Sequence, residues 1–140
     1  MSASTKLSTA VKALSYLASV SPMPKNSADI SDVTGINASK LRKLLSLLVK
    51  SNIVESEKGT NGGFKLKKKS KQISLQEIYC AIEDRKAFHL DVNKSKGSGL
   101  NKNQKLNNYF LDLFNDIQIN IENEMEKISL KNIIDKINSK

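Results

Sequence analysis

The sequence predicts a mainly α-helical winged helix-turn-helix domain with a small β-hairpin wing, followed by a long C-terminal helix for dimerisation. Three observations predict this fold class. A basic amphipathic helix is expected over 37–51, a glycine-rich hairpin follows at once over 53–66, and an apolar stripe with helical period covers 105–127. We therefore expect a DNA-binding domain at 1–85, a flexible loop at 86–104, and the dimerisation helix with a C-terminal helix at 105–140.

Charge is distributed unevenly along the chain. Residues 1–72 contain 13 Lys and Arg against 4 Asp and Glu, whereas residues 73–140 contain 10 of each. The whole net charge of +9 therefore lies in the half that contains the expected basic helix and hairpin. This concentration favours nucleic acid as the partner over a membrane surface, which would need bulky apolar residues exposed along a helix.

Other features limit the class of protein. The chain has no apolar run near about eighteen residues and no leader of the secretory type, which favours a cytoplasmic protein. Cys80 is the single cysteine, so no internal disulfide can form, and this fits a reducing compartment. His89 is the only histidine and has no second ligand nearby, so we expect no metal site. No nucleophile–base pair or phosphate-binding loop is evident, and an enzyme is not expected.

The first helices form the expected helix-turn-helix. A helix over 5–20 ends before a pair of prolines, which cannot continue it. Asn26 caps a short second helix in which Ile30 and Val33 are the expected buried positions, and Gly35 ends it. The basic helix that follows therefore occupies the recognition position.

The recognition helix provides the first candidates for DNA contact. Its leucines recur at spacings of three and four and form an apolar face, which leaves a basic face on the other side. The first turns of such a helix face the bases of the major groove. The candidates are Ser39, Lys40, Arg42 and Lys43. Arg42 is best suited to a bidentate contact with guanine. The alternative is a basic face that is only solvated.

The hairpin provides the second set of candidates, for a minor-groove contact. Its glycines can take the positive φ angles of a tight turn and permit close approach of a backbone. The wing candidates are Lys58, Thr60, Asn61, Gly62, Gly63 and Lys65. The alternative is an ordinary hairpin turn. The basic run over 65–71 is either a solvated strand end or a phosphate contact, and Lys6 and Lys12 are further phosphate candidates.

A fourth helix is expected over 74–85, with Ser74 and Glu77 spaced as a capping box. Cys80 on this helix is interpreted as a small core residue, with a redox sensor as the alternative. The segment 93–103 is rich in Gly, Ser, Asn and Lys and is expected to be a mobile loop.

The apolar stripe of the long helix is too long for the N-terminal unit alone to cover, so a helix of a second subunit is expected to cover it. The expected dimer interface consists of Leu106, Phe110, Leu113, Ile117, Ile121 and Met125. The alternative is that this helix folds back on its own domain. A short final helix is expected over 129–137.

Three segments resemble the Rrf2 family of winged helix-turn-helix transcriptional regulators, and together they span most of the chain. Residues 58–66 (KGTNGGFKL) resemble the wing pattern R-G-x-x-G-G-[YF]-x-L. Residues 73–83 (ISLQEIYCAIE) and 128–134 (ISLKNII) resemble the helix that follows the wing and the close of the family's sequence. The resemblance implies a homodimer that binds operator DNA.

Two departures from the family pattern stand out. Members that sense through an iron–sulphur cluster have about three cysteines before the long helix, whereas residues 87–104 have none. We therefore expect no iron–sulphur cluster and no other cofactor. Lys58 also stands where the wing more often has arginine, which keeps the charge but loses the planar fork.

The expected function is a sequence-specific DNA-binding transcriptional regulator, a repressor that binds a double-stranded operator as a homodimer. Two alternatives remain: a redox-responsive regulator that switches through Cys80, and a protein-interaction module without DNA binding. The sequence identifies neither the operator nor a small-molecule effector.

Overall fold

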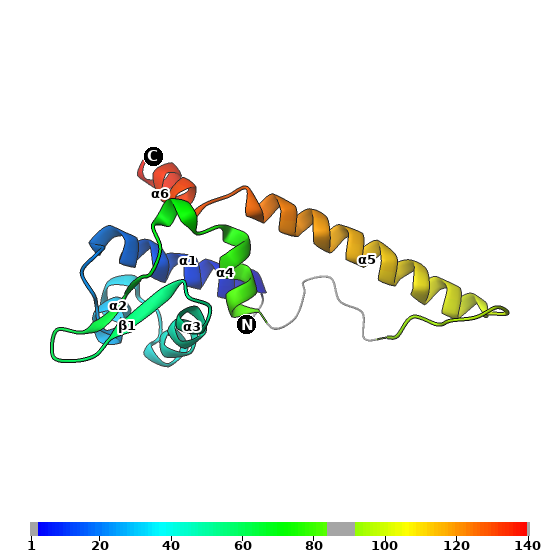
Figure 1. Ribbon diagram of the computed structural model, residues 1–140, viewed down its shortest axis with the longest axis horizontal. Helices are drawn as coiled ribbons and strands as arrows, with labels where there is room; N and C mark the ends of the chain where they lie inside the picture. Colours follow the sequence, from blue (N-terminus) through cyan, green and yellow to red (C-terminus); the bar gives the residue numbers. More distant parts are fainter. Residues whose placement is uncertain (1–2, 84–91, 140) are drawn as a thin grey trace. The chain divides into compact units, whose positions relative to one another are not determined.

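The computed structural model describes residues 3–83 and 92–139. These residues form two compact units, one of 3–83 with 125–139 and one of 92–124. The elements, in chain order, are α1 (Ala3–Val20), α2 (Ser27–Thr34), α3 (Ala38–Lys50), β1 (Val54–Glu57), β2 (Gly63–Leu66), the 3-10 turn η1 (Ser70–Gln72), α4 (Leu75–Ile82), α5 (Lys102–Glu126) and α6 (Leu130–Asn138) (Figure 1). Helices with one two-stranded hairpin confirm the predicted fold class.

Leucines and isoleucines from most elements of the first unit form one core. On α3, Leu41, Leu45 and Leu48 are completely buried, as their spacing predicts for one face of a helix. Leu14 and Leu17 of α1 face the same cluster. Because each buried aliphatic side chain contributes about 1.5–3 kcal/mol, this packing fixes the orientation of α3. The opposite face of α3 is left in solvent.

The helix-turn-helix forms through the local signals that the sequence contains. The Asn26 side-chain oxygen accepts a hydrogen bond from the Asp29 backbone N–H at 2.8 Å and starts α2. Gly35 ends it with φ of 75°, in the left-handed region. Ile30 is buried, but the prediction for Val33 is wrong, because 63% of this residue is exposed. A helix of eight residues offers the core only one buried position, Ile30.

The wing is attached to the helix-turn-helix at its base. Strands β1 and β2 pair antiparallel, with Glu55 opposite Lys65 and Glu57 opposite Gly63. Beyond this pairing, Phe64 forms an isolated bridge with Lys25, in the segment between α1 and α2. The Phe64 N–H donates to the Lys25 carbonyl at 2.7 Å, and the Lys25 N–H donates back at 2.9 Å. These two hydrogen bonds fix where the wing leaves the unit.

Helices α4 and α6 are joined at their starts by a second isolated bridge. The Leu75 N–H donates to the Ile128 carbonyl and the Leu130 N–H donates to the Ile73 carbonyl, both at 2.8 Å. Leu130 is completely buried in the core, so α6 belongs to the first unit.

The caps of the two helices differ. Ser129 and Asn132 form a reciprocal capping box at α6. At α4 the predicted capping box is half present: Ser74 accepts from the Glu77 N–H at 3.0 Å, but the Glu77 carboxylate pairs with Lys68 instead.

Helix α5 is the main element of the second unit and has 25 residues, so it is about 37 Å long. It begins earlier than predicted, because Asn101 and Gln104 cap each other's backbone N–H at 2.9 Å. Within the predicted mobile loop, the Ser95 N–H donates to Asn108 of α5 at 2.9 Å, and Lys94 pairs with Asp112. Of the predicted flexible loop over 86–104, the first part, 86–91, lies outside the described residues, together with His89. No helix in the described ranges is both long and apolar enough to span a membrane.

Candidate nucleic-acid interface

The exposed face of α3 is polar and basic. Asn37 caps the helix by accepting from the N–H groups of Ser39 at 3.0 Å and Lys40 at 3.2 Å. The four predicted contact residues of this helix, Ser39, Lys40, Arg42 and Lys43, are all exposed. A shallow depression on this face is lined by Ser39, Arg42, Lys43, Ser46 and Leu47. The core leucines on the inner side thus direct every predicted contact residue of α3 outward.

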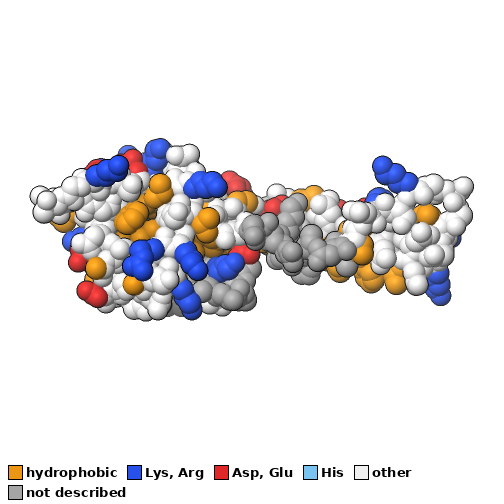
Figure 2. Space-filling model, turned by 90° about the horizontal axis from the view of Figure 1, so that it is seen from below, with side chains coloured by type: hydrophobic (Ala, Val, Ile, Leu, Met, Phe, Trp, Pro, Cys, Tyr) orange, Lys and Arg blue, Asp and Glu red, His pale blue; other side chains and the backbone are white. Residues whose placement is uncertain are grey.

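The basic side chains of this face are not neutralised by the acidic residues that the structure describes. Among the described residues, Lys40, Arg42 and Lys43 form no ion pair with any Asp or Glu. Figure 2 shows this side of the first unit, with several Lys and Arg side chains on the surface and acidic side chains mainly near its edges. A positive surface with unpaired cations attracts a polyanion.

The tip of the wing is a second exposed polar segment. Lys58, Thr60 and Asn61 are exposed in the turn between β1 and β2. Within the described residues Lys58 forms no ion pair either. The tip therefore offers one unpaired cation and two hydrogen-bonding side chains.

The outer face of the wing differs from the basic surface that the sequence suggested. The Lys65 ammonium lies 2.5 Å from the Glu57 carboxylate and 3.5 Å from the Glu55 carboxylate. The hydrogen bond to Glu57, with the charge of both acids, raises the pKa of Lys65 above its usual value of 10.5. With two carboxylates and one ammonium, the group of Glu55, Glu57 and Lys65 has a net negative charge. The sequence pattern alone did not reveal this charge.

The basic run over 65–71 is also largely engaged within the unit. The Lys67 ammonium donates to the Asn52 side chain at 3.1 Å, and Lys68 pairs with Glu77. On α1, the Lys6 ammonium lies 3.4 Å from the Glu83 carboxylate. These contacts reduce the number of cations available to a partner.

The wing glycines have an internal role. A Cβ atom added to Gly63 would lie 2.5 Å from the Lys25 carbonyl oxygen, and Gly63 has φ of 146°. A Cβ atom on Gly62 would overlap the Glu57 carbonyl, although the φ of Gly62 is not in the positive region. Both glycines therefore permit, in the first place, a close approach between segments of this chain's own backbone. The predicted approach to DNA at these positions stays a prediction.

The interpretation of Cys80 as a core residue is wrong, because the structure exposes it. On α4 the residues Ile78, Tyr79 and Ile82 are buried, and Cys80 points away from that face. The Gln76 amide donates to the Cys80 sulfur at 3.1 Å.

The apolar stripe of α5 is largely uncovered in the single chain. Leu106 is 50% exposed, and Phe110, Leu113, Ile117 and Ile121 are half-buried. Phe110 stacks on Phe114, with ring centroids 5.5 Å apart. Met125 is the exception, because it is only 9% exposed, and it does not belong to the uncovered stripe. Tyr109 and Ile119, which the sequence did not select, are 61% and 44% exposed.

Comparison with known proteins gives one family. The Rrf2 family, described as an iron-dependent transcriptional regulator, matches residues 3–136. YwnA of Bacillus subtilis, described as an HTH-type transcriptional regulator, is 32% identical over 126 residues, or 87% of this chain and 91% of that protein. The solved structure of T. potens IscR has a TM-score of 0.70 at 20% identity, over 98% and 88% of the chains. CymR, the global cysteine regulator of B. subtilis, has a TM-score of 0.68 at 18% identity, over 97% and 96%.

The donor set of this chain does not fit an iron–sulphur cluster held by several thiolates. The sequence contains one cysteine, and Cys80 lies on α4 beside an amide. The residues described here contain no group of three or more His, Cys, Asp or Glu side chains that could hold a metal ion.

Proposed function

This chain is a DNA-binding transcriptional regulator of the Rrf2 family, and on that premise we propose that it is a sequence-specific repressor that binds an operator as a homodimer. The members of this family are regulators and not enzymes.

The observation that carries the proposal is the exposed, unpaired basic face of α3. Ser39, Lys40, Arg42 and Lys43 lie in the first two turns, which is the part of a recognition helix that reaches base edges. Arg42 reads a guanine through two parallel hydrogen bonds, and the two lysines hold phosphates.

The tip of the wing makes the second contact. Lys58, Thr60 and Asn61 reach the minor groove beside the major groove that α3 occupies. Because Lys65 is paired with Glu55 and Glu57, the minor-groove contact is made by the tip of the wing, and the strands support the tip. Gly62 and Gly63 contribute to this contact indirectly, because they permit the backbone conformation of the turn.

The long helix α5 joins two subunits through its uncovered apolar stripe, Leu106, Phe110, Leu113, Ile117 and Ile121. A two-fold dimer presents two copies of α3 to two half-sites roughly one or two helical turns of DNA apart. A dimer bound to an operator that overlaps a promoter blocks access to that promoter, which is the basis for repression.

Selection of genomic DNA fragments by the purified protein, followed by sequencing, tests this function. We expect an enriched sequence with two-fold symmetry. Arg42→Ala should weaken binding to the enriched fragment by about 1–3 kcal/mol, and more than binding to random DNA. Lys131→Ala, which removes a cation of α6 that pairs with Asp135, is the matched control and should leave affinity unchanged. Enrichment of no sequence at all would contradict the proposal.

The exposure of Cys80 favours a second candidate function, a regulator that responds to oxidants. Because the chain has one cysteine, oxidation converts Cys80 either to a sulfenic acid or to a disulfide with a thiol of another molecule. DNA affinity measured before and after peroxide treatment, for the natural protein and for Cys80→Ser, decides between the two. A loss of affinity in the natural protein alone would support this candidate.

A further inference from the structure

Leu47 is an exposed apolar residue on the basic side of α3. It is 37% exposed, whereas the other leucines of this helix are at most 6% exposed. Its neighbours in the shallow depression of α3 are Ser39, Arg42, Lys43 and Ser46. The core therefore does not account for Leu47, although it accounts for every other leucine of the helix.

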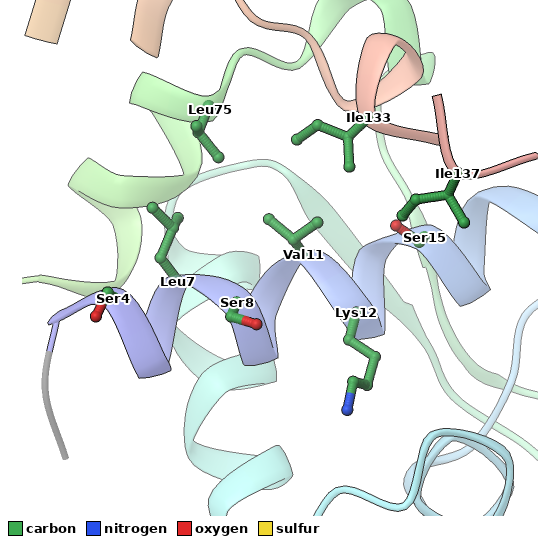
Figure 3. A pocket seen from close by; sticks show the side chains of 9 residues that line it. All are labelled: Ser4, Leu7, Ser8, Val11, Lys12, Ser15, Leu75, Ile133 and Ile137. Carbon is green, nitrogen blue, oxygen red and sulfur yellow. The ribbon is translucent and has the colours of Figure 1, made fainter. Parts of the chain in front are cut away.

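Another hollow of the first unit, between α1, α4 and α6, is a different kind of surface. There the side chains of Leu7, Val11 and Ile133 point toward one another, and Lys12 is the one charged side chain that the described residues contribute (Figure 3). Leu47, in contrast, is one apolar side chain among two cations and two hydroxyl groups. A partner that covers Leu47 must also accept both cations. This requirement favours a polyanion with apolar groups on its surface over an apolar protein.

The helical period places Leu47 beside Lys43. Residues four apart lie on the same side of a helix, one turn and about 6 Å apart along its axis. Lys43 and Leu47 therefore share one side of the exposed face of α3, and Arg42 and Ser46 share the other. A rise of about 6 Å corresponds to roughly two base-pair steps of DNA at 3.4 Å each. Leu47 thus reaches beyond the position that Lys43 occupies in the groove.

The chemistry of the major groove limits what an aliphatic side chain can contact. The apolar group on the base edges of this groove is the C5-methyl group of thymine. The remaining positions on these edges are hydrogen-bond donors and acceptors. A leucine against such a group would remove it from water without offering a hydrogen bond, which is unfavourable. The methyl group of thymine is therefore the base feature that Leu47 fits.

We propose that Leu47 contacts the C5-methyl group of a thymine in the operator and so determines part of the sequence specificity. The inference rests on the proposed function, because it needs α3 in the major groove. It adds one base to the base that Arg42 reads, and it reads that base without a hydrogen bond. Each half-site then contains a thymine at the position that Leu47 reaches.

Replacement of thymine by uracil in the DNA tests this contact. Uracil lacks only the C5-methyl group, so every hydrogen bond of the base pair is kept. Each thymine of the fragment selected by the purified full-length protein is replaced in turn, and the dissociation constant is measured. At the contacted thymine of one half-site, affinity should fall about fourfold, which corresponds to about 0.8 kcal/mol for one methyl group at 1.4 kcal/mol per tenfold.

Variants of Leu47 attribute the loss to this side chain. Leu47→Ala should bind the thymine and uracil fragments equally, whereas Leu47→Met keeps an apolar side chain of similar volume and should still discriminate between them. Val33→Ala is the matched control, since Val33 is 63% exposed on α2 and outside the depression, and it should discriminate as the natural protein does. Each comparison uses one protein with two DNA fragments, so an unfolded fraction of a variant cancels in the ratio.

The outcomes separate the inference from the proposed function. If the natural protein selects no DNA sequence, the proposed function fails and the inference fails with it. If it selects an operator without thymine in its half-sites, or tolerates uracil at every thymine, the function stands and the inference is wrong. If Leu47→Ala discriminates thymine from uracil as strongly as the natural protein, another residue contacts the methyl group, and the inference is overturned.

Discussion

Replacement of Gly63 by alanine tests how the wing is held in place. Gly63 has φ of 146°, a sparsely populated backbone conformation that costs a residue with a Cβ atom roughly 1–2 kcal/mol. The new Cβ atom would also lie 2.5 Å from the Lys25 carbonyl oxygen and 2.7 Å from the Asn26 nitrogen. Both atoms belong to backbone, so the segment between α1 and α2 must move away from β2.

That movement breaks the two hydrogen bonds between Lys25 and Phe64, each of which contributes about 1 kcal/mol. The expected loss of stability for Gly63→Ala is therefore about 3–4 kcal/mol. Gly35→Ala is the matched control: Gly35 has φ of 75° and no atom within 4 Å of an added Cβ, so its loss should be about 1–2 kcal/mol. Both changes alter the entropy of the unfolded chain equally, and this contribution cancels.

Urea denaturation followed by circular dichroism measures the difference. With a slope of about 1–3 kcal/mol per molar urea, a difference near 2 kcal/mol lowers the midpoint of Gly63→Ala by roughly 1 M relative to Gly35→Ala. Equal midpoints would show that the backbone of β2 has room at Gly63, and the bridge to Lys25 would then not hold the wing.

Three further predictions concern the core, a cap and the wing acids. Leu45→Ala removes a completely buried side chain and should lower the free energy of unfolding by about 2–5 kcal/mol in urea denaturation, whereas a loss below about 1 kcal/mol would mean that the site collapses freely. Ser129→Ala removes the cap of α6 and should cost about 1 kcal/mol by the same assay, and no loss would show that Asn132 caps the helix alone. Glu57→Gln weakens the ion pair with Lys65, so the affinity for random DNA should rise and its dependence on salt should become steeper. An unchanged salt dependence would show that Lys65 does not reach a phosphate.

Local signals predicted much of the fold. Spacing of leucines placed the buried face of α3, and Asn26, Gly35 and Ser74 marked the ends of helices, because capping depends on residues only three or four positions apart. The exposed candidates of α3 follow from the same pattern. Contacts between distant segments could not be read in this way.

The differences arise where distant residues meet. The bridge between Lys25 and Phe64 joins segments far apart in sequence. It involves only backbone atoms, so no side-chain pattern predicts it. The Glu77 carboxylate does not take its expected part in the capping box, because it pairs with Lys68, which lies close to it in the fold. Cys80 is small and apolar, yet the orientation of α4 is fixed by larger neighbours that bury the opposite face.

The wing shows the same limit for function. Its lysines suggested a basic hairpin, but the register of the strands sets Lys65 opposite Glu55, with Glu57 close by. Register depends on the whole hairpin and its base. The DNA-binding candidates at the tip, Lys58, Thr60 and Asn61, stay predictions.

The dependence of affinity on salt shows whether the unpaired cations of α3 and the wing tip bind DNA. Binding of the natural protein to its selected fragment should weaken steeply between about 50 and 200 mM salt, with a slope of log affinity against log salt near −0.9 for each phosphate contacted. Removing Lys43 by Lys43→Ala should reduce that slope by about 1, and Lys131→Ala should not change it. An affinity that does not respond to salt, or a slope that is equal in all three proteins, would show that these cations do not contact DNA phosphates.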